Sequence, residues 1–131
     1  METKQTKTNF TGVGEISKKQ DNSSMIQTID INAKEWFDKV NGNSYFCGTI
    51  TINYGMKTEQ TFLMPFQYGY GSQYEQKAKS ILVFNKIIKE CWSLYSYCKD
   101  NNIILRSTLI ENCLKRELKE IEYDVKNYFN N

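Results

Sequence analysis

The residues between Pro65 and Glu75 have the side chains and spacing best suited to binding a ligand. This junction holds the only proline of the chain, followed by four aromatic rings and two glycines. Glycine lets the backbone approach a ligand closely, and aromatic rings offer flat faces for stacking a planar, polar molecule. An ordered turn whose tyrosines cap the core has the same composition, so both interpretations stay open. The candidate binding residues here are Phe66, Gln67, Tyr68, Gly69, Tyr70, Gly71 and Tyr74.

The two arginines of the chain are the natural partners for a phosphate group. Arg106 precedes the last predicted helix, and Arg116 lies within it, with Asn112 and two lysines at neighbouring helical offsets. A guanidinium fork can pair with two phosphate oxygens at once. Arg106, Asn112 and Arg116 therefore complete the candidate ligand-binding set. The alternative is a solvated helix face on which glutamates pair with the basic residues.

Catalytic and metal-binding chemistry has little support in this sequence. The chain contains no histidine, which excludes Ser-His and Cys-His nucleophiles. Its four cysteines form no CxxC pair and are expected to be small buried residues. No dinucleotide or P-loop motif is present. We therefore expect neither a metal nor a cofactor, and the sequence favours a binding protein over an enzyme.

Length and charge restrict the possible partners further. The 131 residues suit one domain, and a net charge of +2 is too small for a general nucleic-acid binder. No run of about 18 apolar residues is present, so no membrane span is expected. The start of the chain lacks the apolar segment of a signal peptide, which predicts a cytoplasmic protein.

The pattern of the first half predicts a small antiparallel sheet after a polar segment. Residues 1–24 are rich in Lys, Thr, Asn and Ser and predict a loosely ordered arm, followed by a single α+β domain over 25–131. Alternation predicts a strand over 25–31 and a hairpin formed by 45–54 and 58–66. Asn32 and Glu35 have the spacing of a capping box, which predicts a short helix over 33–40.

The pattern of the second half predicts two long helices. The capping-box pairs Ser72/Glu75 and Thr108/Glu111 predict helices over about 73–99 and 109–128, with a short β-prone segment between them. We interpret the apolar stripe of the first helix as core packing. Two such helices exceed what a small sheet can cover, so the chain is expected to bury the excess in a homo-oligomer, a dimer or larger.

The segment from residue 25 to about 82 resembles Thoeris anti-defence protein 1, a family of phage nucleotide sponges. The similarity is carried by residues 41–46, by the following hairpin and by the stretch from Pro65 to Gly71 that leads into Tyr74 and Glu75. The resemblance implies binding of cyclic ADP-ribose isomers, made by a Thoeris TIR-domain sensor, without cleavage, in the cytoplasm of an infected host. It also implies a sheet capped by C-terminal helices, with the ligand held between subunits of a symmetric oligomer.

Three other functions remain open on the sequence. The first is a phage inhibitor that binds a host defence protein directly, in the manner of an anti-CRISPR protein, through its hairpin edge or a helix face. The second is a small enzyme that cleaves the nucleotide with Glu or Tyr. The third is a weak nucleic-acid binder that uses its tyrosines as a stacking platform.

Overall fold

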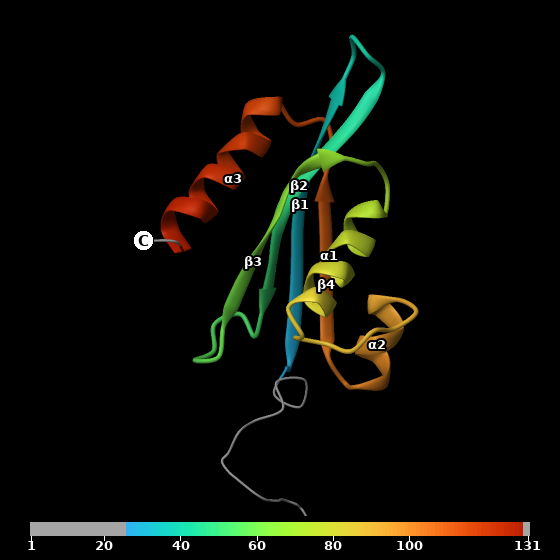
Figure 1. Cartoon of the computed structure of the whole chain (residues 1–131), viewed down its shortest axis with the longest axis vertical. Helices are drawn as coiled ribbons and strands as arrows, with labels where there is room; N and C mark the ends of the chain where they lie inside the picture. The colour runs from blue at the N-terminus through green and yellow to red at the C-terminus, as the bar shows by residue number, and fades with distance from the viewer. Residues whose placement is uncertain (1–25, 130–131) are drawn as a thin grey trace, which may run out of the picture.

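Four strands form one mixed sheet in the order β3–β2–β1–β4, and helices cover both of its faces (Figure 1). The computed structural model describes residues 26–129, so the expected arm over 1–24 lies outside the described residues. Helices α1 and α2 lie on one side of the sheet and α3 on the other. The elements are β1 (Thr28–Asp38), β2 (Asn43–Ile52), β3 (Gln60–Tyr68), α1 (Gln73–Phe84), α2 (Leu94–Asp100), β4 (Ile104–Ile110) and α3 (Lys115–Phe129).

The predicted hairpin is confirmed as β2 and β3, which pair antiparallel. Alternation puts Phe46, Ile50 and Ile52 of β2 in the core beneath α1. On the opposite face of β2, Cys47 is fully buried. Its burial follows from α3, which packs on β2 and β3 and buries its own Leu118 completely. The predicted strand over 25–31 is confirmed from Thr28 onward.

The predicted helix over 33–40 is wrong, because β1 continues as a strand to Asp38. Ala33 pairs with Gly48 of β2 on one side and with Leu109 of β4 on the other, so β1 has a partner strand along both edges here. The ladder on both sides of β1 outweighs the local helix signal of Asn32 and Glu35.

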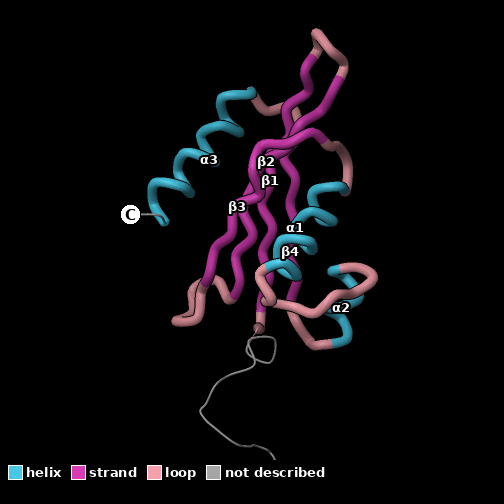
Figure 2. The backbone as a smooth tube through the Cα atoms, viewed as in Figure 1, coloured by secondary structure: helices cyan, strands magenta, loops and turns pink. Residues whose placement is uncertain are grey.

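The predicted helix over 73–99 is wrong as well, because it is two helices joined by an irregular segment, 85–93 (Figure 2). Asn85 ends α1 by donating from both its backbone and its side-chain amide to the carbonyl of Ile81. Lys86 then adopts a positive φ of 61°, which no helix continues. Ser93 begins α2 by accepting a hydrogen bond from the Ser96 N–H at 3.1 Å.

The predicted helix over 109–128 begins later than expected, at Lys115. Thr108, the expected cap, lies inside β4, which pairs parallel with β1. Asn112 has a positive φ of 61° in the turn that follows. The fold is therefore α+β as predicted, but its sheet is mixed and carries three helices, not two long C-terminal ones. Because these helices cover both faces, the predicted surplus of helix surface gives no reason for self-association.

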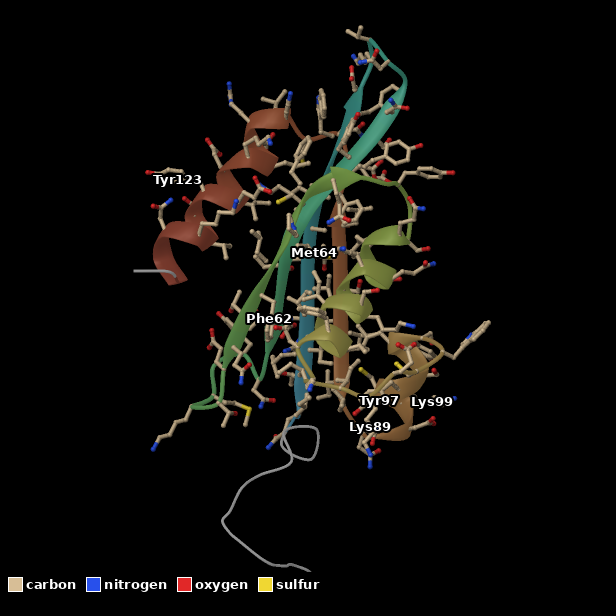
Figure 3. The ribbon with its side chains drawn as sticks, viewed as in Figure 1. Phe62, Met64, Lys89, Tyr97, Lys99 and Tyr123 are labelled. Atoms are coloured by element: carbon tan, nitrogen blue, oxygen red, sulfur yellow. The ribbon has the colours of Figure 1, made fainter. Side chains whose placement is uncertain are left out.

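The main core lies between the sheet and α1 with α2. Ile29, Ile31, Ile50, Met64 and Leu82 are completely or almost completely buried there. Figure 3 shows Met64 inside the molecule and Tyr123 of α3 pointing away from the sheet. None of the helices in residues 26–129 is long and apolar enough to cross a bilayer.

Candidate functional site

A groove of about 720 Å³ lies between α1 and the start of α2. Pockets for small organic ligands usually have volumes of roughly 300–1,000 Å³, so this groove has the size of a small-molecule site. The sheet forms its apolar floor, and the two helices supply most of its polar groups. The lining residues are Ile31, Ser72, Glu75, Gln76, Lys79, Ser80, Trp92, Ser93, Leu94, Tyr95 and Leu105.

Two aromatic side chains stand at the rim of the groove with their surfaces largely in solvent. Trp92 is 93% exposed and Tyr95 is 69% exposed. Both positions depend on the break after α1, because a continuous helix would have placed them on its buried stripe. Large exposed aromatics cost solvation free energy and commonly mark a binding surface. Among the exposed aromatic residues, Trp92 and Tyr95 are the ones that line the groove.

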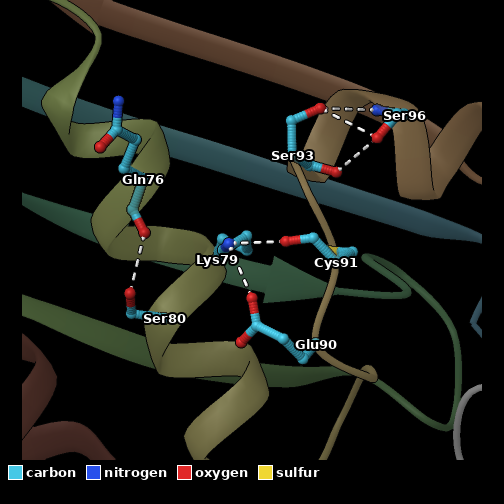
Figure 4. Close-up of polar contacts among 7 residues, drawn as sticks. All are labelled: Gln76, Lys79, Ser80, Glu90, Cys91, Ser93 and Ser96. Carbon is cyan, nitrogen blue, oxygen red and sulfur yellow. Dashed lines mark hydrogen bonds and ion pairs between the residues drawn. The ribbon is translucent and has the colours of Figure 1, made fainter.

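Lys79 supplies the positive charge among the groove-lining residues and fixes the shape of one wall (Figure 4). Its Nζ donates to the Cys91 carbonyl at 2.7 Å and to Glu90 Oε2 at 3.1 Å. These bonds connect α1 to the irregular segment before α2. The Lys79 side chain is only 20% exposed, whereas that of Glu90 is 74% exposed. Glu90 therefore lies largely in solvent, whereas Lys79 is held within the groove wall.

Glu75 ends a chain of hydrogen bonds that runs from Tyr74 of α1 to Ser107 of β4 and returns to α1. Ser107 Oγ donates to Glu75 Oε2 at 2.6 Å, so its single proton is used and the Tyr74 hydroxyl must donate to Ser107 Oγ at 2.7 Å. Burial raises the pKa of Tyr74, and the negative charge of Glu75 raises it further. Tyr74 therefore remains a neutral donor. The chain holds the Glu75 carboxylate at the groove wall, where it can accept hydrogen bonds from hydroxyl or amino groups.

The expected capping box at the start of α1 is not formed. The Ser72 side chain makes no capping hydrogen bond, and Glu75 is committed to Ser107. Instead, Gln73 Oε1 accepts from the Tyr70 N–H at 2.8 Å and holds the preceding turn. Gly71 in that turn has a φ of 62°, which favours glycine.

The structure places the predicted junction residues on both sides of the sheet. Phe66 lies on the α3 side, where its ring stacks on Tyr45 with centroids 5.3 Å apart. Tyr74 lies on the α1 side and is buried. Tyr68 and Tyr70 are 59% and 60% exposed. Of the remaining predicted residues, Gln67 donates to the Pro65 carbonyl, and a Cβ on Gly69 would contact the Phe46 ring.

The remaining predicted residues, Arg106, Asn112 and Arg116, lie on β4 and at or just before the start of α3. Arg106 pairs with Asp30 on the α3 side of β4 and β1. Arg116 is exposed in the first turn of α3, and Asn112 is exposed in the turn before it. None of these three residues lines the groove.

A second cluster, formed by Trp36, Tyr45, Phe66 and two lysines of α3, combines aromatic rings with positive charge. Trp36 stacks on Tyr45, Lys115 Nζ lies 5.3 Å from the Trp36 ring centre, and Lys119 Nζ lies 4.2 Å from that of Phe66. These ring faces are already covered by one another and by lysines. The cluster therefore attaches α3 to the sheet and offers less free surface than the groove.

The sequence pattern concealed Trp92 and Tyr95 because both fit the helical spacing of a core stripe. The usable signal was Ser93, since a serine before Leu94 can begin a new helix. The sequence pattern did not mark Lys79 as a groove residue, because its partners Glu90 and Cys91 come from a segment whose path depends on the whole fold. Comparison with protein-family models, with curated proteins and with solved structures finds no match for this chain.

Proposed function

We propose that the protein binds a signalling nucleotide of the cyclic ADP-ribose type in the groove between α1 and α2 and holds it without cleaving it. The observation that carries this proposal is one groove of suitable size that combines two exposed aromatic rings, a carboxylate and a lysine above an apolar floor. The sequence resemblance to nucleotide sponges supports the same class of ligand.

Each part of such a ligand has a partner of matching chemistry in the groove. Adenine would stack on Trp92 or Tyr95, as bases do on aromatic platforms. Ribose hydroxyls would donate to Glu75. The pyrophosphate would pair with Lys79 once Glu90 has moved away, since a buried phosphate charge needs a counter-charge.

Sequestration without cleavage fits the residues that line the groove. The chain has no histidine to act as a base near neutral pH. Glu75 accepts a hydrogen bond from Ser107, and Tyr74 stays protonated because burial raises its pKa. These groups are suited to holding hydroxyl groups in place.

The biological setting of the proposal is defence by bacteria against phage. The protein would act in the cytoplasm of the infected host, remove the signal of a Thoeris TIR-domain sensor and keep the effector inactive. The proposal requires no cofactor, metal, membrane or nucleic acid. Assembly into a homo-oligomer is a separate expectation.

Depletion followed by heat release tests this proposal. The full chain is incubated with the product of a Thoeris TIR enzyme, filtered to remove free ligand, and denatured by heat. We expect depletion of the signal and its return with unchanged mass on denaturation. Cleaved products would show an enzyme instead, and an undepleted signal would reject nucleotide binding.

The turn between β1 and β2 supports a second candidate, an inhibitor that binds a host defence protein. This hairpin projects beyond the helices at the top of Figure 1. It presents Val40, which is 92% exposed, and Phe37, which is 46% exposed. Two exposed apolar side chains on a projecting turn would give a protein partner a surface to contact.

The variant Val40→Asp with Phe37→Ser separates the two candidates. If the hairpin is the functional surface, this variant should lose protection of phage in infected cells while retaining any signal binding. If the groove is the functional site, Trp92→Ala should lose both signal binding and protection of phage, and the hairpin variant should retain both.

A further inference from the structure

The two edges of the sheet differ in how well they are protected against pairing with another strand. At the β3 edge, Pro65 has no N–H, and the N–H of Phe66 donates to Glu122 Oε2 of α3 at 2.9 Å. Strand β4, at the other edge, contains neither proline nor lysine and no acidic residue. Among the described residues, no strand pairs with its outer side. Natural proteins usually block such an edge.

The hydrogen bonds to β1 show which backbone groups of β4 point outward. The Ile104 N–H donates to the Gln27 carbonyl at 3.0 Å, and the parallel register runs from Ile104 to Ile110. In a parallel ladder, alternate residues direct their N–H and C=O to the same neighbour. Ile104 and every second residue after it therefore bond to β1. Leu105, Ser107 and Leu109 direct their backbone groups away from the sheet.

The sequence of β4 is symmetrical in character about Ser107. Isoleucines stand three residues before and three residues after it, at 104 and 110, and leucines stand two before and two after it, at 105 and 109. If two copies pair antiparallel with their Ser107 residues opposite each other, Ile104 faces the partner's Ile110. Leu105 likewise faces the partner's Leu109. Apolar side chains would therefore pair with apolar side chains on both faces of the joined sheet.

This register also satisfies the direction of the backbone groups. Antiparallel strands alternate between hydrogen-bonded and non-hydrogen-bonded pairs. Leu105, Ser107 and Leu109 would form the hydrogen-bonded pairs, and these are the residues whose groups point outward. Ile104 and Ile110 would form non-hydrogen-bonded pairs, in which side chains approach most closely. They are 58% and 52% exposed, so pairing would remove apolar surface from water.

Electrostatic repulsion does not oppose the pairing of two β4 strands. Arg106 is the one charged residue of β4, and it pairs with Asp30 of the same sheet. In the symmetrical register it would lie opposite the partner's Thr108, so no like charges stand directly opposite each other.

We propose that two copies of this chain associate through β4, paired antiparallel about a two-fold axis at Ser107, so that two four-stranded sheets become one continuous sheet. The occupant of this edge is a second copy because the strand is complementary to itself. The inference is independent of the nucleotide proposal. The dimer would use the backbone groups along the outer edge of β4, whereas the groove floor is formed by the face of the sheet that is turned toward α1.

Charge exchange across the interface tests both association and register. Ile104→Lys places a cation near Asp30, and Ile110→Glu places an anion beside Lys34, so each change suits its own sheet. Sedimentation of the full chain should show a dimer, and each single variant should weaken it at least ~10-fold, because a charge then faces an isoleucine. The double variant should regain the dimer, since lysine would then face the partner's glutamate twice.

A monomer at every soluble concentration of the parent chain would overturn the proposal. Single variants that dimerise as well as the parent would overturn it too, as would a double variant no better than the singles. Far-ultraviolet circular dichroism should be unchanged in all variants, because both isoleucines are exposed. A disulfide test checks the register independently: mixed Ile104→Cys and Ile110→Cys chains should crosslink, whereas Ile104→Cys alone should not, since its two sites would lie about 20 Å apart.

Discussion

Arg106 and Asp30 form a two-pronged ion pair across β4 and β1. Arg106 Nε lies 2.5 Å from Asp30 Oδ1, and Nη2 lies 3.1 Å from Oδ2. The two residues are direct neighbours in the parallel register, so the planar guanidinium and carboxylate meet edge to edge. The hydrogen bond to Asp30 and the charge of its carboxylate raise the pKa of Arg106. The arginine that the sequence offered as a phosphate ligand thus has a carboxylate partner within its own sheet.

Arg106→Gln should leave nucleotide affinity unchanged and slightly lower the melting temperature. The Arg106 side chain is 56% exposed, although that of Asp30 is only 15% exposed, so the difference in melting temperature should shrink in part as salt is added. Calorimetric titration of the signal and thermal melts at low and high salt measure the two effects. Arg116→Gln, on the exposed start of α3, serves as the control. A large loss of affinity in either variant would restore the arginines as phosphate ligands.

Trp92→Ala and Tyr95→Ala should each weaken nucleotide binding by roughly 1–3 kcal/mol if the lost ring carries a stacked base. Their melting temperatures should change little, since both side chains are exposed. Tyr68→Ala and Tyr70→Ala are matched controls, because these tyrosines are similarly exposed but lie outside the groove. If affinity falls in the controls and not in the groove variants, the ligand binds at the junction as the sequence predicted.

Lys79→Met should weaken nucleotide binding by about 1.5–3 kcal/mol, the range for a hydrogen bond to a charged group. Methionine retains the length and apolar stem of lysine but cannot pair with a phosphate. Glu90→Gln should have the opposite effect, because it releases Lys79 from its ion pair. Titrations at one ionic strength compare the two variants with the parent chain. Equal affinities in all three proteins would show that Lys79 only supports the groove wall.

The free energy of unfolding should fall as pH rises from about 9 toward 12. Burial raises the pKa of Cys47 from its ordinary value of 9.0 to about 12, and the charge of Glu122 adds to the shift. Below pH 9 the thiol is protonated in both states, so its contribution to stability is complete. Above pH 9 the unfolded chain gains a thiolate that the folded chain excludes, which favours unfolding.

Urea unfolding at several pH values measures this effect, with Cys47→Ala as the control. The alanine variant should lose stability less steeply over the same range. Identical slopes would show that Cys47 does not contribute. Burial raises the pKa of Cys98 to about 11. This thiol should lower the free energy of unfolding in the same way, over a narrower pH range.

Gly48→Ala should destabilise the fold by roughly 1–3 kcal/mol, the usual cost of overpacking a core. A Cβ at this position would collide with the carbonyl of Asn32 and lie 2.7 Å from the Ala33 Cα. Gly42→Asn is the control, because its φ of 72° in an open turn is one that asparagine tolerates. Urea midpoints compare the two variants, and equal stabilities would contradict the close contact.

The hairpin of β2 and β3 was predictable because residues close together in the sequence determine both its strands and its turn. Alternating residues on each side of the turn near Gly55 define both strands and their pairing. The course of β1 was not predictable in this way. Asn32 and Glu35 have a helical spacing, but Ala33 pairs with residues 48 and 109, which are distant in sequence.

The candidate groove could not be predicted because it depends on one local departure from helical geometry. Lys86 adopts a backbone conformation that its residue type rarely favours, and the helical periodicity continues past it. Trp92 consequently matched a buried stripe in sequence and lies almost wholly in solvent in the structure. The sequence predicted the junction aromatics as one binding set, but strand alternation and the turn direct Phe66 and Tyr74 to opposite sides of the sheet.

The parallel pairing of β1 with β4 also determines when the chain can finish folding on the ribosome. Asp30 and Arg106 are 76 residues apart in sequence, so β1 leaves the ribosome well before its partner exists. At an elongation rate of about 5–20 residues per second this delay is roughly 4–15 s, during which β1 has one unpaired edge. Pairings over such long separations are also slow to nucleate, because the intervening chain must first be ordered. The nascent protein therefore depends on the prompt arrival of β4, and a chain stopped before residue 104 would carry a permanently open strand edge prone to aggregation.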